Sequence, residues 1–503
     1  MLSTGSVFSS SFKEYATGER SKARHTLAAI ALLLSAFSTQ ALEINSKTIT
    51  LQAGGELSFE AGYVNVPENR SVADSRMIQV AFYRFKADEG VDGAPMVVLP
   101  GGPGGSYTQR LESERSQPFA VNIIETFRDH GDVIFVDLRG IALSKPNTVC
   151  EGPSSKFRTL FTLTDLKSVF QDSARTCREK LLQEGFDLEG YTVIEAAADV
   201  VAVIDALGYQ TFRLYGNSFG SHWSLTTLRY HADRVERAII SGTEGYDHTW
   251  DHPAGLRRAA EMISEAATPA WQAAGREGSP LSTLDALLDK AQRDSDLAHG
   301  IQAHEVALLG LSGQGFALSG RESVKGWPAA VAELDDGEGW LMRWGFRLLG
   351  AWFLGGESES AAAVGTLDCA SGLSAERRAE MEAIDDPLFS QAAFFNYDSI
   401  CPAWAVPALP DAFRAGEQID VPVLFVHGDV DFSTPLQNAY ETLEAFPNGH
   451  LVVMENGTHG AFPVGIEISE TLQGVVDDWL QGTPPAVERI ALPPLEFDPV
   501  PSP

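Results

Sequence analysis

Residues 212 to 232 read FRLYGNSFGSHWSLTTLRYHA, and they give the strongest indication of the fold. Its first five residues form an apolar run that is typical of a buried strand. The residues after Gly220 can form a helix, so Ser218 lies on a sharp strand-to-helix turn. Glycines two residues to either side of the serine, Gly216 and Gly220, avoid clashes in the strained backbone of such a turn. The stretch therefore predicts a strand, a turn that presents Ser218, and a helix whose amino terminus stabilises negative charge.

Apolar strand-like runs alternate with helical patterns on both sides of this stretch, which is the rhythm of a parallel sheet. The predicted strands are MIQVAFYRF (77–85), PMVVLP (95–100), DVIFVD (132–137), FRLYG (212–216), RAIISG (237–242), VPVLFVHGD (421–429) and HLVVMEN (450–456). The first of these alternates between apolar and polar residues, as an antiparallel strand does. The fold class is therefore α/β, a mostly parallel central sheet flanked by helices.

Between the two groups of strands the sequence becomes helix-rich, which predicts a large helical cap inserted into the α/β core. The predicted segments are a signal peptide (1–41), the first part of the core (42–245), the cap (246–417), the second part of the core (418–485) and a proline-rich tail (486–503). No internal repeat of 20 to 50 residues is apparent.

The first segment has the pattern of a secretory signal. Lys22 and Arg24 precede the apolar run TLAAIALLLSAF (26–37), and small residues follow up to Ala41. The run is shorter than the roughly twenty residues that cross a bilayer, so we expect a cleaved signal rather than a retained anchor. The predicted location is the periplasm or the medium, with no stable membrane insertion after cleavage.

The sequence is strongly acidic, with 68 acidic and 37 basic residues and a formal net charge of -31. A field of this sign repels phosphate backbones, so nucleic acid is excluded as a partner class. The simplest interpretation is a highly soluble surface, and attraction of cationic substrates such as peptide amino termini is the second.

Four cysteines occur in the chain, and an even number in an exported protein permits disulfides. We prefer the local pairing of Cys150 with Cys177 and of Cys369 with Cys401. Each of these disulfides closes a loop of about thirty residues and adds roughly 3 kcal/mol to the free energy of unfolding. Buried free thiols are the alternative. None of the four lies in a CxxC spacing, so no metal site is expected.

A glycine-rich loop follows the strand PMVVLP and reads Gly101-Gly102-Pro103-Gly104-Gly105-Ser106. Its backbone can approach a ligand closely and present amide hydrogens to it. In a sheet of this kind one oxyanion donor is the amide after the nucleophile, here Phe219. The second comes from the loop after the third strand, and Gly102 is the expected donor.

An acid and a histidine follow the last two predicted strands, at the sheet edge where ligand sites form. His459 is the expected general base for Ser218, and Asp431 is preferred to Asp429 as the acid that orients it, because it lies deeper in its loop. We interpret His427, beside the same strand end, as structural. The chain order serine, acid, histidine matches the order used in this type of fold.

Together these motifs resemble the prolyl aminopeptidases and secreted tripeptidyl aminopeptidases of the α/β-hydrolase superfamily. The resemblance extends over most of the mature chain, and the matching pieces are LPGGPGGS, DLRGIALSKP, GNSFGS, HGDVDFSTP and GTHG. Pro100 stands where prolyl aminopeptidases usually carry a histidine, and Ala142 replaces a common glycine. In the family the aspartate three residues before the Thr-Pro pair is the triad acid, which is Asp431 here.

The resemblance implies an exported serine exopeptidase that acts through an acyl-enzyme on Ser218, binds peptides with free amino termini and needs no cofactor. Glu244, Asp247 and Asp251, at the start of the cap, are candidates for binding the amino terminus, and solvated loop acids are the alternative interpretation. A carboxylesterase with the same triad is the alternative function, since fold does not fix substrate. A non-catalytic binding module is the third hypothesis, which the intact motifs disfavour. The sequence gives no indication of oligomeric state.

Overall fold

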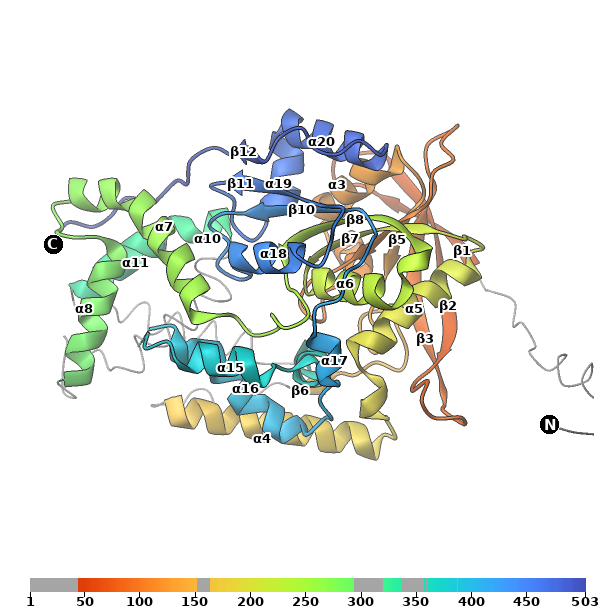
Figure 1. The fold of residues 1–503 in the computed structure, drawn as a ribbon, viewed down its shortest axis with the longest axis horizontal. Coiled ribbons are helices and arrows are strands. Elements are labelled where there is room, and N and C mark those ends of the chain that lie inside the picture. Colours follow the sequence, from red (N-terminus) through yellow and green to blue (C-terminus); the bar gives the residue numbers. More distant parts are fainter. Residues whose placement is uncertain (1–43, 152–162, 294–319, 337–356, 359, 387) are drawn as a thin grey trace, which may run out of the picture. The chain divides into compact units, whose positions relative to one another are not determined.

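The structure is a computed structural model, and it describes residues 44–151, 163–293, 320–336, 357–358, 360–386 and 388–503 (Figure 1). The predicted signal peptide over residues 1–41 lies outside the described residues. No helix within these ranges is both long and apolar enough to pass through a bilayer.

A ten-stranded sheet runs through the α/β core in the order β1-β2-β3-β5-β4-β7-β8-β10-β11-β12. The first three strands and the β3–β5 pair are antiparallel, and every later pair is parallel. The strands are β1 (Ile44–Thr50), β2 (Glu56–Pro67), β3 (Met77–Phe85), β4 (Met96–Leu99), β5 (Val133–Val136), β7 (Phe212–Ser218), β8 (Val235–Thr243), β10 (Val423–Gly428), β11 (Gly449–Glu455) and β12 (Arg489–Ala491). The predicted fold class is confirmed.

The central strands are short and apolar because helices cover both faces of the sheet. Every residue of β4, β5 and β10 is buried, which explains why these strands read as continuous apolar runs. Figure 1 shows α3 (Gln117–Arg128), α19 (Ala461–Ile468) and α20 (Glu470–Leu480) on one face. On the other face lie α5 (Val193–Ala206), α6 (Phe219–His231) and α18 (Leu436–Leu443).

The insertion is helical, as expected, and part of it forms a hydrophobic core of its own. Apolar residues of α7 (Pro253–Ala273), α8 (Pro280–Arg293) and α11 (Trp327–Asp335) pack together around the fully buried Trp271. The other described helices of the insertion are α10 (Arg321–Lys325), α13 (Ser360–Ala363), the π-helical segment η5 (Val364–Asp368), α14 (Cys369–Ser371), α15 (Ala375–Glu382), α16 (Ser390–Trp404) and α17 (Asp411–Arg414).

A second cluster joins the insertion to α4 (Leu163–Gln183), which precedes it in the chain. Leu181 of α4 packs in the same cluster as Trp404 of α16, and both side chains are almost fully buried. Nearby, β6 (Cys150–Glu151) and β9 (Glu357–Ser358) form a small antiparallel pair. The helical layer therefore includes a segment from before residue 246, the boundary expected for the cap.

Two disulfides lie in this region, with the pairing preferred from the sequence. Cys150 is bonded to Cys177 of α4, and Cys369 of α14 is bonded to Cys401 of α16. The described residues include no free cysteine. The second disulfide fixes α14 against α16.

The tail begins with β12 on the sheet edge and continues over the insertion without regular structure. Leu495, Phe497 and Val500 pack against the core of the insertion. Arg276 donates a hydrogen bond of 2.7 Å from Nε to the carbonyl oxygen of Pro501. The tail is thus packed against folded structure over most of its length.

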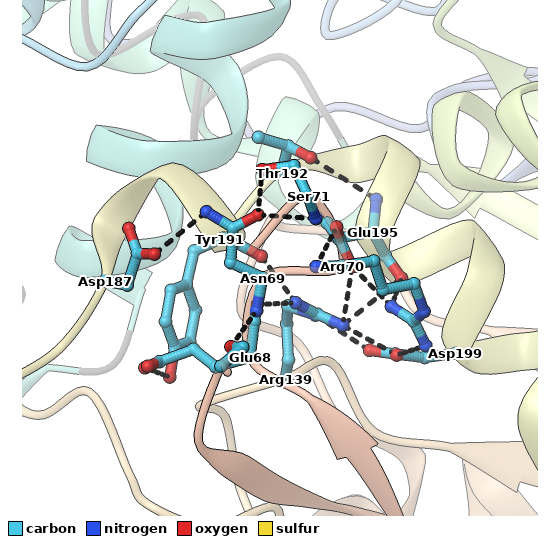
Figure 2. Close-up of polar contacts among 12 residues, drawn as sticks. Glu68, Asn69, Arg70, Ser71, Arg139, Asp187, Tyr191, Thr192, Glu195 and Asp199 are labelled. Carbon is cyan, nitrogen blue, oxygen red and sulfur yellow. Dashed lines mark hydrogen bonds and ion pairs between the residues drawn. The ribbon is translucent and has the colours of Figure 1, made fainter. Parts of the chain in front are cut away.

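A buried ionic network fixes the segment after β5 to α5 (Figure 2). Arg139 donates from Nε and Nη2 to the two carboxylate oxygens of Asp199, at 2.8 Å and 2.7 Å. Its Nη1 donates to the carbonyl oxygen of Glu68 at 2.6 Å, and Arg70 also donates to Asp199. Because a buried charge is costly unless it is paired, this two-pronged contact gives Arg139 a structural role.

Candidate active site

Ser218 occupies a strained turn between β7 and α6. It is the last residue of β7, and its φ of 60° lies in the left-handed region that L-residues rarely adopt. A Cβ atom on Gly216 would lie 2.1 Å from the carbonyl oxygen of Gly220, and one on Gly220 would lie 2.1 Å from that of Leu99. Only glycine fits at these two positions, which explains the spacing of the motif.

The glycine-rich loop lies directly against this serine. A Cβ atom on Gly101 would be 2.8 Å from Cβ and 3.3 Å from Oγ of Ser218. Gly102 has a φ of 133°, which glycine adopts without strain. Phe219 is the first residue of α6, so its amide belongs to the helix amino terminus that has no intrahelical acceptor. The structure therefore brings the two predicted oxyanion-hole segments to the same serine.

His459 and Asp431 meet across the ends of neighbouring parallel strands. Nδ1 of His459 lies 3.0 Å from Oδ2 and 3.1 Å from Oδ1 of Asp431. The Asp431 carboxylate also accepts hydrogen bonds of 2.9 Å from the amides of Ser433 and Thr434, and one of 2.8 Å from the Thr434 hydroxyl. The carboxylate is therefore held in place before any substrate arrives.

The electrostatics of this pair keep the acid ionised and the histidine basic. Burial by itself would raise the pKa of Asp431, but the charge and hydrogen bond of His459 lower it below its usual value. Burial would likewise lower the pKa of His459, but Asp431, and to a smaller extent Asp251, raise it. With Nδ1 directed at the carboxylate, Nε2 is the nitrogen free to accept a proton.

Asp429, the competing acid, has a different partner. Its Oδ2 lies 3.5 Å from Nη2 of Arg489 on β12. The geometry thus favours Asp431, which contacts the histidine directly. His427 is fully buried, accepts a hydrogen bond of 2.9 Å from the amide of Thr243, and links the ends of β10 and β8. This contact agrees with the structural interpretation of His427.

The three predicted substrate-binding acids fall into two kinds. Asp247 accepts a hydrogen bond of 2.8 Å from the amide of Ser374, the residue that caps α15, so its carboxylate is already engaged. Glu244 and Asp251 accept no hydrogen bond from side chains or amides in the described part of the chain. Burial, and then the charge of Asp368, raise the pKa of Glu244 well above its usual value. The pKa of Asp251 is also raised well above its usual value, by burial and then by the charges of Glu244 and Asp431.

Comparisons with protein families agree with this architecture. A model of the α/β-hydrolase fold matches residues 94–266, and a model of TAP-like (tripeptidyl aminopeptidase-like) proteins matches residues 386–488. This chain is a serine hydrolase of the α/β-hydrolase fold with a TAP-like C-terminal domain. The TAP-like match contains both Asp431 and His459, and the fold match contains Ser218.

Comparison with solved structures gives matches of low sequence identity and low TM-score. Serine hydrolase CCSP0084 from Cycloclasticus zankles is 15% identical with a TM-score of 0.36, over 88% of this chain and 99% of that one. An esterase from Thermogutta terrifontis is 14% identical with a TM-score of 0.36, over 83% and 98%. An esterase from Exiguobacterium antarcticum is 14% identical with a TM-score of 0.35, over 84% and 99%. No curated protein matches the chain.

Two residues that were not expected from the sequence take part in the contacts or the electrostatics of the predicted site residues. Thr434 contacts both members of the acid–histidine pair, since its hydroxyl lies 3.1 Å from Nδ1 of His459. Asp368, just before the disulfide-bonded Cys369, is buried, and its Oδ1 has no hydrogen-bond partner among the residues that the structure describes. Thr434 lies within the HGDVDFSTP motif. No sequence motif marks Asp368, because its electrostatic effect on Glu244 arises only in the folded chain.

The contacts of His222, one of the two histidines on α6, indicate a structural role. His222 is fully buried, with Nδ1 3.0 Å from the carbonyl oxygen of Gly245 and Nε2 3.0 Å from the hydroxyl of Ser371. Burial lowers its pKa to about 4, so the ring stays neutral. Within the residues that the structure describes, no three His, Cys, Asp or Glu side chains are grouped as metal ligands.

Proposed function

We propose that this hydrolase is an exported serine exopeptidase that releases residues from peptide amino termini through an acyl-enzyme on Ser218. The observation that carries the proposal is a chain of acids beside the acid–histidine pair: Asp368 raises the pKa of Glu244, and Glu244 and Asp431 raise the pKa of Asp251. A carboxylate that is shielded from water and lies near another acid is costly to ionise, so such acids suit a cationic ligand. A peptide amino terminus is such a ligand, and the TAP-like match supports it.

The geometry supports a conventional acyl-transfer sequence. Nε2 of His459 removes the proton of Ser218, whose Oγ attacks the carbonyl carbon of the scissile bond. The amides of Phe219 and Gly102 stabilise the resulting oxyanion. His459 then donates its proton to the leaving amine, and an activated water releases the acyl group in the same way. Asp431 keeps the proton on Nδ1 and stabilises the imidazolium.

The acids fix where the substrate amino group lies. A protonated amine that binds beside Glu244, Asp251 or Asp368 would supply a counter-charge to the carboxylate and favour its ionised form. Acetylation removes that positive charge and should therefore weaken binding. An esterase that recognises only an acyl group gains nothing from three acids at this position.

The test is hydrolysis of prolyl, alanyl and tripeptidyl arylamides, each with a free and an acetylated amino terminus, with Ser218→Ala as the blank. Asp368→Asn is compared with Asp247→Asn, which changes an acid of the same region that is already engaged by Ser374. We expect cleavage of free amino termini only, and a raised KM in Asp368→Asn but not in Asp247→Asn. Equal cleavage of acetylated substrates, or turnover of short acyl esters without any amide turnover, would favour the carboxylesterase.

Export is a separate part of the proposal. Two disulfides and the predicted signal peptide support it, because disulfides persist in oxidising compartments. The amino-terminal sequence of the protein recovered from periplasm or medium should begin after Ala41. A protein retained in the cytoplasm with an intact amino terminus would contradict export and leave the catalytic proposal unaffected.

A further inference from the structure

Two aspartates flank β5, one at each end, and only one of them contacts the glycine-rich loop. Asp137 follows the strand at the edge where the candidate active site lies and is 1% exposed. Its Oδ1 accepts a hydrogen bond of 2.7 Å from the hydroxyl of Ser106. Its Oδ2 accepts one of 2.7 Å from the hydroxyl of Thr108 and one of 3.2 Å from the amide of Leu143.

These contacts lead from Asp137 to the serine through a short path. Ser106 ends the glycine-rich loop and also caps α2 (Tyr107–Glu112), since its Oγ accepts a hydrogen bond of 3.0 Å from the amide of Gln109. Within the loop, the amide of Gly105 donates to the carbonyl oxygen of Gly101 at 3.0 Å. Gly101 in turn lies against Ser218.

A loop made largely of glycine needs such an anchor. Glycine restricts its own backbone less than any other residue, so neighbouring contacts must fix the direction of the loop amides. Donors of an oxyanion hole work only when they are held at the place where the negative charge develops. An acid that fixes one end of the loop therefore affects the transition state more than it affects substrate binding.

We propose that Asp137 is a positioning residue that holds the glycine-rich loop in the geometry needed to stabilise the oxyanion. The inference rests on the proposed function, because it takes Ser218 as nucleophile and Gly102 as one oxyanion donor. Asp137 acts through Ser106 and Thr108.

The experiment compares Asp137→Asn with Asp132→Asn, a matched change at the other end of the same strand. Asp132 likewise accepts several hydrogen bonds, from the amide of Ala87 at 2.8 Å, from Nζ of Lys86 at 3.1 Å and from the hydroxyl of Tyr209. For each variant the measurements are kcat and KM on the best arylamide, the second-order rate of labelling by a fluorophosphonate, and the urea midpoint.

We expect kcat and the labelling rate of Asp137→Asn to fall together by about tenfold to a hundredfold, with KM changed by less than about threefold. Asp132→Asn should lose stability without losing kcat. Full kcat in Asp137→Asn, or equal loss of kcat in both variants, would overturn the inference and leave a purely structural role.

If Asp137→Asn does not fold, Thr108→Ala and Thr108→Ser provide the same comparison, because only serine keeps the hydroxyl that donates to Asp137. Thr108→Ala should lower kcat and Thr108→Ser should restore it, whereas equal kcat in the two would overturn the inference. Ser218→Ala distinguishes a failure of the proposed function from a failure of the role proposed for Asp137. If Ser218→Ala still reacts with the probe, the proposed function fails, and if it is inert while Asp137→Asn is fully active, only this inference fails.

Discussion

Asp431 holds His459 by a contact in which Nδ1 lies 3.0 Å from Oδ2 and 3.1 Å from Oδ1 of the carboxylate. The carboxylate is itself fixed by the amides of Ser433 and Thr434. The carboxylate therefore determines both the tautomer and the orientation of the ring.

Replacing Asp431 by asparagine should lower kcat by about ten-thousand-fold, because the amide favours the wrong histidine tautomer. Asp429→Asn is the matched control, since Asp429 lies two residues away and pairs with Arg489 instead. Steady-state kinetics on one arylamide measure both. A larger loss in Asp429→Asn than in Asp431→Asn would exchange the roles of the two acids.

The pH dependence of kcat/KM should depend on the charge of Asp251. His459 must be neutral to accept a proton, so kcat/KM falls on the acid side as the ring becomes protonated. Burial lowers the pKa of His459, but Asp431 and Asp251 raise it to a value above the ordinary one near 6.5. Asp251→Asn should move the acid limb of the profile to lower pH, while Asp247→Asn leaves it in place. An acid limb unchanged in Asp251→Asn would remove Asp251 from the site.

Glu244 should lower the stability of the folded protein at neutral pH, although it contributes to substrate binding. Burial and Asp368 raise the pKa of Glu244, so the folded state holds this proton more tightly than the unfolded state does. Stability is therefore lost as the pH rises from the ordinary Glu range toward the raised pKa, and each pKa unit corresponds to about 1.4 kcal/mol. Glu244→Gln should raise the urea midpoint at pH 8 but not at pH 4, and raise KM for free amino termini. A lower midpoint at pH 8 would mean that Glu244 is paired.

The disulfide beside Asp368 should serve both stability and substrate binding. Cys369 and Cys401 are 32 residues apart, so replacing both by serine should cost about 3 to 4 kcal/mol through loop entropy. Because Cys369 adjoins Asp368, KM for free amino termini should rise as well. Replacing Cys150 and Cys177 is the control, with a comparable loss in urea unfolding and an unchanged KM. An unchanged urea midpoint and an unchanged KM in the variant without Cys369 and Cys401 would show that this disulfide supports neither stability nor substrate binding.

The tail should stabilise the insertion. Deleting residues 495–503 removes the contacts of Leu495, Phe497 and Val500 with the insertion core and the bond from Arg276 to Pro501. About 2 to 4 kcal/mol of stability should be lost, given the partial burial of three apolar side chains. Urea unfolding and limited proteolysis of the insertion measure this, with deletion of residues 502–503 as control. An unchanged midpoint in the longer deletion would show that the packing contributes nothing.

The sheet could be predicted because its central strands are buried on both faces and read as apolar runs, as β4 and β10 do. Ser218, Asp431 and His459 could be placed at one edge because each follows a parallel strand. Asp368 could not be found, because its approach to Glu244 depends on how the insertion folds back. The engagement of Asp247 by Ser374 depends on the same tertiary packing.

Labelling of the folded wild-type protein with a fluorophosphonate, with the adduct located by peptide mass spectrometry, tests directly whether Ser218 is the nucleophile. A single adduct on Ser218 is expected, formed far more slowly in Asp431→Asn and absent from Ser218→Ala. An adduct on another residue, or none on a correctly folded protein, would contradict the assignment of Ser218 as the nucleophile.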